Sequence, residues 1–431
     1  MTTRIKNATL VLADRCLIGD LDITGERISA VHPDHAESPP DQIIQAKGTY
    51  LLPAFIDLHS NGIAGFDFTN GWFMNGRFSN EEADYHHGLE QAAAAYAASG
   101  VSRALLTSLA APIDTLQRVF ALYSAYRSSN QASFLVKNIL AGIYVEGTFI
   151  KNTAFRGAHN DDYFCTPTIE LFDSLRAFSR DQIRIVNVPP EWGARGETLI
   201  HHMSEQGVIP AAGHTGASGL DYEQAIEHGV RLAIHLFNGP TGSSFKPFLH
   251  GGAVEAILRS QELWAELIVD GYHVDPGYVL DAVRRKGSHR IVAVTDNMFA
   301  AGLKDLTEFM ILGVHGEVSE NRRYLQVKGR SDTLCGSVLT MDQAFANLLT
   351  WFTQDYPGIW YEKHEALSLP DALIKAATLC STNPATLLGL NQTGTIAVGK
   401  LADLLLVDIQ QTDLAYQVTV NKVFIKGKQV I

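Results

Sequence analysis

Histidines and acids follow several short apolar runs in this 431-residue chain, and side chains of these types bind metal ions and transfer protons. One such run lies in "VIPAAGHTGASGL", residues 208–220, where apolar residues lead to Gly213 and then to His214. An apolar run followed by glycines is typical of a strand that ends in a turn. The same pattern recurs between residues 51 and 296, where the runs end, in chain order, near His59, Asn61, Glu146, His214, His235, His273 and Asp296.

Three of these residues form a ligand set for a divalent metal ion. Glu146 offers a carboxylate oxygen, and His214 and His235 offer two imidazole nitrogens, a set that leaves one position open for water. A single histidine beside an apolar run is more often structural, so the combination carries the prediction. A bound metal lowers the pKa of water and polarises a carbonyl group. We expect one divalent ion, with zinc as the first choice and iron, cobalt, manganese and nickel as alternatives.

Asp296, in "AVTDNM", ends the last of these runs. A carboxylate there could accept a proton from an attacking water and pass it to a leaving nitrogen. The alternative is that Asp296 caps the next helical segment. Its place in the set of strand-end residues favours a catalytic role.

The elements that must position these residues alternate between short apolar strands and longer helical patterns. Helical segments, such as the alanine-rich one that ends at Gly100, separate most of the strands. Eight strands are the number that closes a parallel (β/α)8 barrel, in which catalytic groups gather at the carboxyl ends of the strands. The predicted strands are "YLLPAFIDLHS", "VSRALLTS", "NILAGIYVEG", "QIRIVNV", "GVIPAAGH", "RLAIHLF", "ELIVDGYH" and "RIVAVTD".

The two ends of the chain differ from this repeating pattern. Residues 1–50 and 393–431 are rich in short β-like pieces and turns and poor in helix. We therefore predict a small β-sandwich domain built from both ends, with a (β/α)8 barrel domain over residues 51–392.

Composition limits the classes of partner. The formal net charge of −12 argues against broad binding to nucleic acid, which requires a basic face. The four cysteines, Cys16, Cys165, Cys335 and Cys380, form no Cys-x-x-Cys pair, which argues against a thiolate zinc site or a disulfide framework. The first residues lack the apolar core of a signal peptide, and the sequence has no run of about 20 apolar residues, so we expect neither a signal peptide nor a membrane span. We expect a cytoplasmic protein that acts on a small molecule, without a membrane or nucleic acid partner.

Eight ordered motifs extend over most of the chain: "LLPAFIDLHSNG", "YVEGTF", "RGAHN", "AAGHTGAS", "IHLFNGP", "VDGYHVD", "VTDNMFAAGL" and "LCGSVLTM". Together they resemble the motifs of the N-acetylglucosamine-6-phosphate deacetylases of the amidohydrolase superfamily. The resemblance implies a (β/α)8 barrel with a β-sandwich formed by both ends. It also implies metal-dependent removal of the acetyl group from an N-acetyl amino sugar 6-phosphate, in a homodimer.

The resemblance also implies roles for single residues. The positions of Glu146, His214 and His235 match the metal ligands of the family, and Asp296 matches its general acid and base. The substrate-binding positions are His159 beside the scissile amide, His273 at another substrate contact, and Asn238 and Gly239 at the sugar phosphate.

The chain departs from the family pattern at three places. The first motif has His59 and Asn61 where some members have His-x-His, so a second metal ion there stays open beside the preferred single ion. Tyr144 and Thr148 alter the usual His-Leu-Glu-Gly-Pro-Phe motif. Lys246 stands where the family commonly has a phosphate-binding arginine, and it is either a phosphate contact across a dimer interface or a solvated loop lysine.

These departures leave alternative substrates open. The nearest alternative is an amidohydrolase that acts on a non-phosphorylated N-acetyl sugar, an N-acyl amino acid or a cyclic amide, because function depends on the site and not on the fold. A non-catalytic sugar-binding or metal-binding protein is the alternative from a different class. The presence of Asp296 beside all three candidate ligands argues against it.

Overall fold

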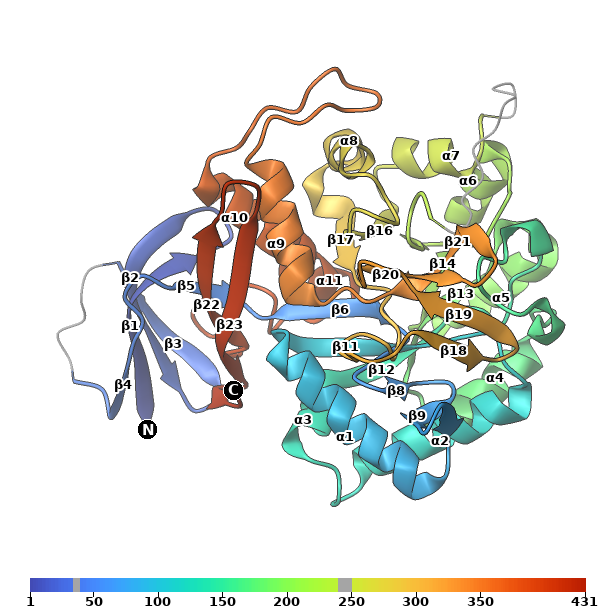
Figure 1. The fold of residues 1–431 in the computed structure, drawn as a ribbon, viewed down its shortest axis with the longest axis horizontal. Helices are drawn as coiled ribbons and strands as arrows, with labels where there is room; N and C mark the ends of the chain where they lie inside the picture. The colour runs from blue at the N-terminus through green and yellow to red at the C-terminus, as the bar shows by residue number, and fades with distance from the viewer. Residues whose placement is uncertain (34–38, 239–249) are drawn as a thin grey trace.

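The computed structural model describes residues 1–33, 39–238 and 250–431 (Figure 1). Its centre is an eight-stranded parallel sheet in which each strand pairs with the next strand of the series along the chain. The strands are β6 (Phe55–Ser60), β11 (Val101–Ser108), β12 (Leu140–Val145), β13 (Ile183–Asn187), β14 (Ile209–Ala212), β15 (Leu232–Ala233), β16 (Trp264–Ile268) and β17 (Ile291–Val294).

The last strand of this sheet lies beside the first. The N–H of Asp296 donates to the carbonyl of His59 at 2.8 Å, and the N–H of Asn61 donates to the carbonyl of Asn297 at 2.8 Å. These bonds join the carboxyl ends of β6 and β17 and bring the sheet round into a barrel. The predicted (β/α)8 barrel is confirmed.

Helices surround the barrel and bury their apolar faces against its outer surface (Figure 1). The barrel interior is filled by the inward side chains of the strands, such as Ile56, Leu105 and Ile185. The helices are α1 (Glu82–Ala98), α2 (Ile113–Ser128), α3 (Phe134–Ile139), α4 (Ile169–Phe178), α5 (Ala194–Glu205), α6 (Gly219–Glu227), α7 (Ala253–Arg259), α8 (Pro276–Lys286), α9 (Met341–Phe352), α10 (Leu369–Ala377) and α11 (Asn383–Leu387).

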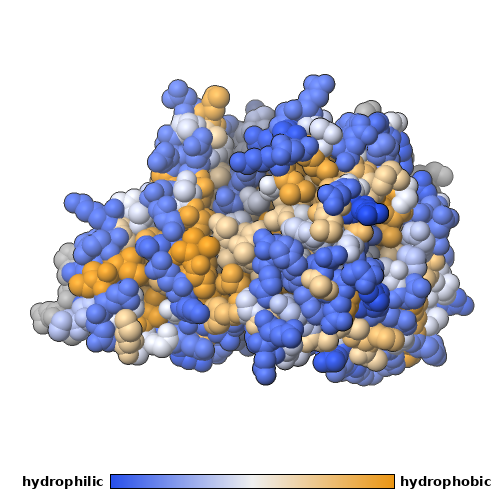
Figure 2. Space-filling view, turned by 60° about the horizontal axis from the view of Figure 1, so that its bottom comes forward, coloured by the Kyte–Doolittle hydropathy of each residue, from blue (hydrophilic) through white to orange (hydrophobic). Residues whose placement is uncertain are grey.

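Both chain ends contribute to one mixed sheet beside the barrel, which confirms the prediction of a small β unit built from the two ends. β5 pairs in parallel with β1 and antiparallel with β22, so it joins the N-terminal strands to the C-terminal ones. On the face drawn in Figure 2, apolar side chains gather over this sheet. Its strands are β1 (Thr2–Val11), β2 (Cys16–Thr24), β3 (Arg27–His32), β4 (Gln42–Gln45), β5 (Tyr50–Pro53), β22 (Leu404–Gln411), β23 (Tyr416–Ile425) and β24 (Lys428–Gln429).

The first predicted barrel strand, residues 50–60, is two strands in the structure. Tyr50–Pro53 belongs to the terminal sheet as β5, and Phe55–Ser60 belongs to the barrel as β6. Ala54 separates them and donates its N–H to the carbonyl of Asp403. The sequence shows one continuous apolar run because nearly every residue on both sides of the break is buried.

Two smaller antiparallel sheets were not predicted. One contains β7 (Gly62–Ile63), β8 (Phe66–Asp67), β9 (Gly71–Met74) and β10 (Arg77–Ser79), between β6 and α1. The other contains β18 (Glu308–Ile311), β19 (Val314–Val318), β20 (Tyr324–Val327) and β21 (Arg330–Ser337), and it lies at the carboxyl end of the barrel (Figure 1). Among the described helices, none has both the length and the apolar character needed to cross a membrane.

Candidate metal centre and active site

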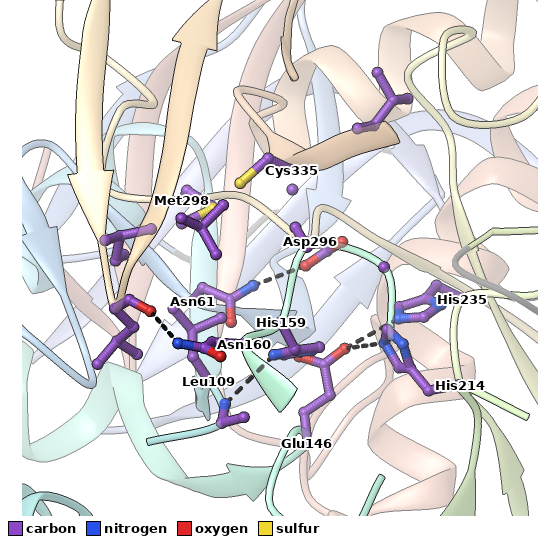
Figure 3. Close-up of a pocket in the computed structure, with 18 of the residues that line it drawn as sticks. Asn61, Leu109, Glu146, His159, Asn160, His214, His235, Asp296, Met298 and Cys335 are labelled. Carbon is purple, nitrogen blue, oxygen red and sulfur yellow. Dashed lines mark hydrogen bonds and ion pairs between the residues drawn. The ribbon is translucent and has the colours of Figure 1, made fainter. Parts of the chain in front are cut away.

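The carboxylate of Glu146, directly after β12, is the centre of a buried cluster of imidazoles (Figure 3). Its Oε1 lies 3.2 Å from Nε2 of His214 and 3.0 Å from Nε2 of His235. These histidines follow β14 and β15, so three different strand ends supply the cluster. The three residues predicted as metal ligands are therefore brought together at the carboxyl end of the barrel.

Hydrogen bonds on the far side of each ring set the tautomers of His214 and His235. Nδ1 of His214 lies 2.9 Å from the carbonyl of Phe155, and Nδ1 of His235 lies 3.1 Å from the carbonyl of Asn238. A carbonyl only accepts, so each neutral ring carries its proton on Nδ1 and turns the lone pair of Nε2 toward Glu146. Two lone pairs and a carboxylate oxygen converge without a donor between them, which is the arrangement of ligands around a cation.

His59 adds a third nitrogen of the same kind. Its Nδ1 lies 2.9 Å from Oε2 of Glu266, so its Nε2 also presents a lone pair, 3.4 Å from Oε1 of Glu146. This Nε2 is fully buried and makes no hydrogen bond within the part of the chain that the structure describes. Asn61, by contrast, turns its amide toward Asp296. Two groups of these side chains, which share Glu146, could each hold a metal ion: His59, Glu146 and His235, and Glu146, His159 and His214. The predicted ligands His214 and His235 both lie beside Glu146 but belong to different groups.

The charges of Glu146 and His214 agree with this assignment. Burial favours the neutral forms of His59 and His235, but the nearby Glu146 outweighs it and raises the pKa of both imidazoles. Burial alone would raise the pKa of Glu146, but the surrounding histidines hold it well below its usual range, so the carboxylate is ionised. Burial lowers the pKa of His214 to about 4, which keeps its imidazole neutral near pH 7. An ionised carboxylate and a neutral imidazole are the forms that bind metal ions.

His159 has the opposite tautomer. Its Nδ1 accepts from the backbone N–H of Ala110 at 3.3 Å, so a neutral ring carries its proton on Nε2. That Nε2 lies 3.6 Å from Oε2 of Glu146, at the edge of the cluster. His159 therefore presents a donor to the cavity where His214 and His235 present lone pairs, and it could bind a carbonyl oxygen of a substrate.

Asp296 lies across the cluster from Glu146 (Figure 3). Its Oδ1 accepts from Nδ2 of Asn61 at 2.7 Å and lies 3.5 Å from Nε2 of His59. The backbone at Asp296 has a φ of 47°, a left-handed conformation that non-glycine residues adopt rarely and that often marks functional sites. Burial raises the pKa of Asp296, which brings it toward the range useful for proton transfer.

Except for His59, these residues line one cavity. His273, whose Nδ1 lies 2.6 Å from Oδ2 of Asp270, borders the same cavity, as does Asn238. The predicted Gly239 and Lys246 lie outside the described residues. The small sheet after β17, which the sequence pattern does not predict, contributes an apolar wall formed by Ile311, Leu312, Val314, Leu334 and Cys335.

Two buried residues that hold the cluster in place were also missed. Asn187, at the end of β13, donates from Nδ2 to the carbonyl of Glu146 at 3.1 Å and accepts at Oδ1 from the N–H of Gly213 at 3.0 Å. Glu266, in β16, binds the ring of His59 and accepts from the N–H of His235 at 3.2 Å. A lone acid within the apolar run "WAELIV" and an asparagine at a strand end were the available signals.

Replacing Asn187 with leucine should weaken metal binding by about 10- to 100-fold. Its side chain hydrogen-bonds to the backbone of both Glu146 and Gly213, and leucine would remove both bonds. The measurement is metal affinity in a competition titration with a chelator. Asn383→Leu is the matched control, since Asn383 is also buried and donates to the carbonyls of Ser288 and Ile291 at the other end of the barrel. Equal losses of affinity in both variants would show a general loss of stability and contradict the role of Asn187.

Comparisons with known proteins agree with this geometry. A model of the Amidohydrolase family matches residues 50–430, so the chain belongs to the amidohydrolase family, whose members use a divalent metal ion. A relative from Lysinibacillus sphaericus, an N-acetylglucosamine-6-phosphate deacetylase, is 30% identical over 71% of this chain and 72% of its own length. An N-acetylgalactosamine-6-phosphate deacetylase from Escherichia coli O157:H7 is 28% identical over 94% of this chain and 95% of its own.

Solved structures show the same relationship. A variant of the N-acetyl-D-glucosamine-6-phosphate deacetylase of Mycobacterium smegmatis, in complex with N-acetyl-D-glucosamine-6-phosphate, is 25% identical and has a TM-score of 0.81. The two chains cover 100% and 99% of each other. Within the amidohydrolase family, the chain thus groups with the N-acetylglucosamine-6-phosphate deacetylases, and the resemblance inferred from its motifs is confirmed.

Proposed function

We propose that this protein hydrolyses the N-acetyl group of an N-acetyl amino sugar 6-phosphate, releasing acetate and the amino sugar phosphate. The observation that carries the proposal is that one cavity is lined by candidate metal ligands, a hydrogen-bond donor and a buried carboxylate. His214 and His235 present lone pairs beside an ionised Glu146, His159 presents a donor, and Asp296 presents a buried carboxylate. The names of the relatives from Lysinibacillus sphaericus and Escherichia coli support the substrate class and leave the sugar epimer to experiment.

In the proposed reaction, Glu146, His214 and His235 hold one divalent ion, for which we propose zinc. When bound, this ion polarises the acetyl carbonyl and lowers the pKa of water. Nε2–H of His159 donates to the carbonyl oxygen as negative charge develops there. Asp296 takes the proton of the attacking water and then delivers it to the departing nitrogen, so that the amine leaves without a negative charge.

The sugar is proposed to lie against the remaining polar side chains of the cavity. His273 and Asn238 border it, and Asp270 fixes the ring of His273. Asn238 and Gly239 are proposed to face the 6-phosphate. Lys246 is proposed to bind this phosphate with its ammonium group across the interface of a homodimer. We place this activity in the cytoplasm, in line with the unpaired, scattered cysteines.

The test is a panel of four substrates with metal content determined on the same preparation. The panel contains N-acetylglucosamine-6-phosphate, N-acetylgalactosamine-6-phosphate and both unphosphorylated sugars, and the readout is release of primary amine. We expect one zinc ion per chain and a kcat/KM for a phosphorylated sugar at least about 100-fold above that for its free form, since charged contacts contribute about 1.5–3 kcal/mol each. Equal rates with and without phosphate, or no amine release from metal-loaded protein, would reject the proposal.

A further inference from the structure

A second hollow lies at the opposite end of the barrel from the metal centre. Its lining comes from the first residues of several barrel strands, such as Ala141 in β12, Arg184 in β13 and Ile209 in β14. Helix α3 and Lys426, from the terminal sheet, complete it. Its volume is about 420 Å³, which is enough for a small metabolite. The proposed deacetylation uses none of these residues.

The charged residues of this hollow are all basic. They are Arg103, Arg127, Lys137, Arg184 and Lys426, and no acid is among the described residues that line it. The chain as a whole has 34 basic and 46 acidic residues, so an average surface would present more acids than bases. The hollow is therefore a local region of positive potential on an acidic protein.

Among the described residues, a carboxylate neutralises only one of these five charges. Nη2 of Arg103 lies 3.2 Å from Oδ2 of the buried Asp403. Within the described ranges, no carboxylate oxygen approaches within 4.0 Å of the other four basic groups. Converging like charges repel one another, and a bound anion would remove this repulsion.

Arg127 is held in place at the rim of the hollow. Its Nε donates to the carbonyl of Leu140 at 2.6 Å, and its terminal nitrogens donate to Oε1 of Gln182 at 3.1 Å and to the carbonyl of Lys137 at 3.2 Å. A guanidinium has five N–H donors, so one donor on each terminal nitrogen stays available for a ligand. An arginine fixed in this way loses little conformational entropy when it binds phosphate.

The remaining lining indicates the size and class of the ligand. Leu105, Ile209, Leu388 and Leu390 form an apolar floor, and no aromatic ring is present among the described lining residues. A nucleotide base would find no stacking partner there. We propose that this hollow binds a small phosphorylated metabolite with at least two anionic groups, at a site separate from the acetyl-hydrolysing centre.

The experiment is a calorimetric titration of the metal-loaded protein with fructose 1,6-bisphosphate as a probe. Glucosamine 6-phosphate is present at saturating concentration, so that the catalytic cavity is blocked. We expect one binding event per chain in the wild type. The double variant Lys137→Glu, Arg184→Glu should weaken it at least about 100-fold, because each reversed cation removes a charged hydrogen bond worth about tenfold or more.

The matched control is the double variant Arg15→Glu, Lys47→Glu, which changes the net charge equally at exposed positions in the loops between strands of the terminal sheet. Its affinity for the probe should stay within about threefold of the wild type, since exposed charges at a distance are screened by salt. Both double variants should keep the deacetylation rate. Absence of binding to the wild type in the presence of glucosamine 6-phosphate, or equal losses in both double variants, would overturn the proposal. If deacetylation itself proves wrong, the comparison of the two double variants still decides this one.

Discussion

Replacing Asp296 with asparagine is expected to lower kcat by about 10²- to 10⁴-fold while the metal content stays near that of the wild type. The asparagine has the same shape, and its Oδ1 can still accept the hydrogen bond from Asn61 that Asp296 accepts at 2.7 Å. It cannot take up a proton from water or return one to the leaving nitrogen. The measurements are kcat for amine release and the metal-to-protein ratio of the same sample.

Asp305→Asn is the control for this prediction. Asp305 is exposed, follows Asp296 in the same loop region and does not line the catalytic cavity. Its replacement changes the net charge equally and should leave kcat within about twofold, as is usual for exposed positions. An Asp296→Asn protein that binds metal and turns over at the wild-type rate would refute the proposed acid and base.

The second large effect is expected for His214→Ala, which should reduce bound metal to less than about a tenth and lower kcat/KM by more than about 100-fold. His214 supplies one of the three proposed ligand atoms, and its ring is already oriented by the carbonyl of Phe155 at 2.9 Å. Loss of a residue that merely orients a ligand costs about 10- to 100-fold in metal affinity, so loss of a ligand should cost more. Metal content after dialysis is the direct measurement.

His202→Ala separates this effect from the general loss of an imidazole. His202 lies in α5 and does not line the cavity. Its Nε2 lies 2.8 Å from Oδ1 of Asp173. Its variant should keep full metal content and activity. Excess metal should restore part of the activity of His214→Ala, because Glu146 and His235 still offer two ligand atoms. Full metal content in His214→Ala would move the proposed metal site elsewhere.

The buried polar residues behind the cluster explain why the rings are oriented so consistently. Glu266 binds the ring of His59 and the backbone of His235, and Asn187 ties the backbone of Glu146 to that of Gly213. Buried polar groups are costly unless they are hydrogen-bonded. Asn187 therefore satisfies its own bonding needs while fixing the candidate ligands. Glu266 does so through Oε2 alone, since its buried Oε1 makes no hydrogen bond among the described residues.

The order of strands and the identity of the strand-end residues could be predicted from the sequence. A parallel barrel places all carboxyl strand ends together, so a local pattern such as "GVIPAAGH" was enough to bring His214 near Glu146. The same local patterns revealed that both chain ends form β structure. These features depend on the periodicity of apolar residues, which can be recognised from residues that are close in sequence.

Features that depend on contacts distant in sequence required the tertiary structure. The break at Ala54 follows from pairing of β5 with β22, more than 350 residues further on, and apolar residues are buried on both sides of it. The tautomers of His159 and His214 depend on which backbone group faces Nδ1 of each ring. The basic hollow draws single residues from helices, barrel strands and the terminal sheet. The sequence by itself determined which side chains reach the strand ends. Only the packing of distant segments decided the tautomers of these side chains and the buried residues that hydrogen-bond to them. The same packing formed the basic hollow, because hydrogen-bond partners and charge clusters are set by proximity in space.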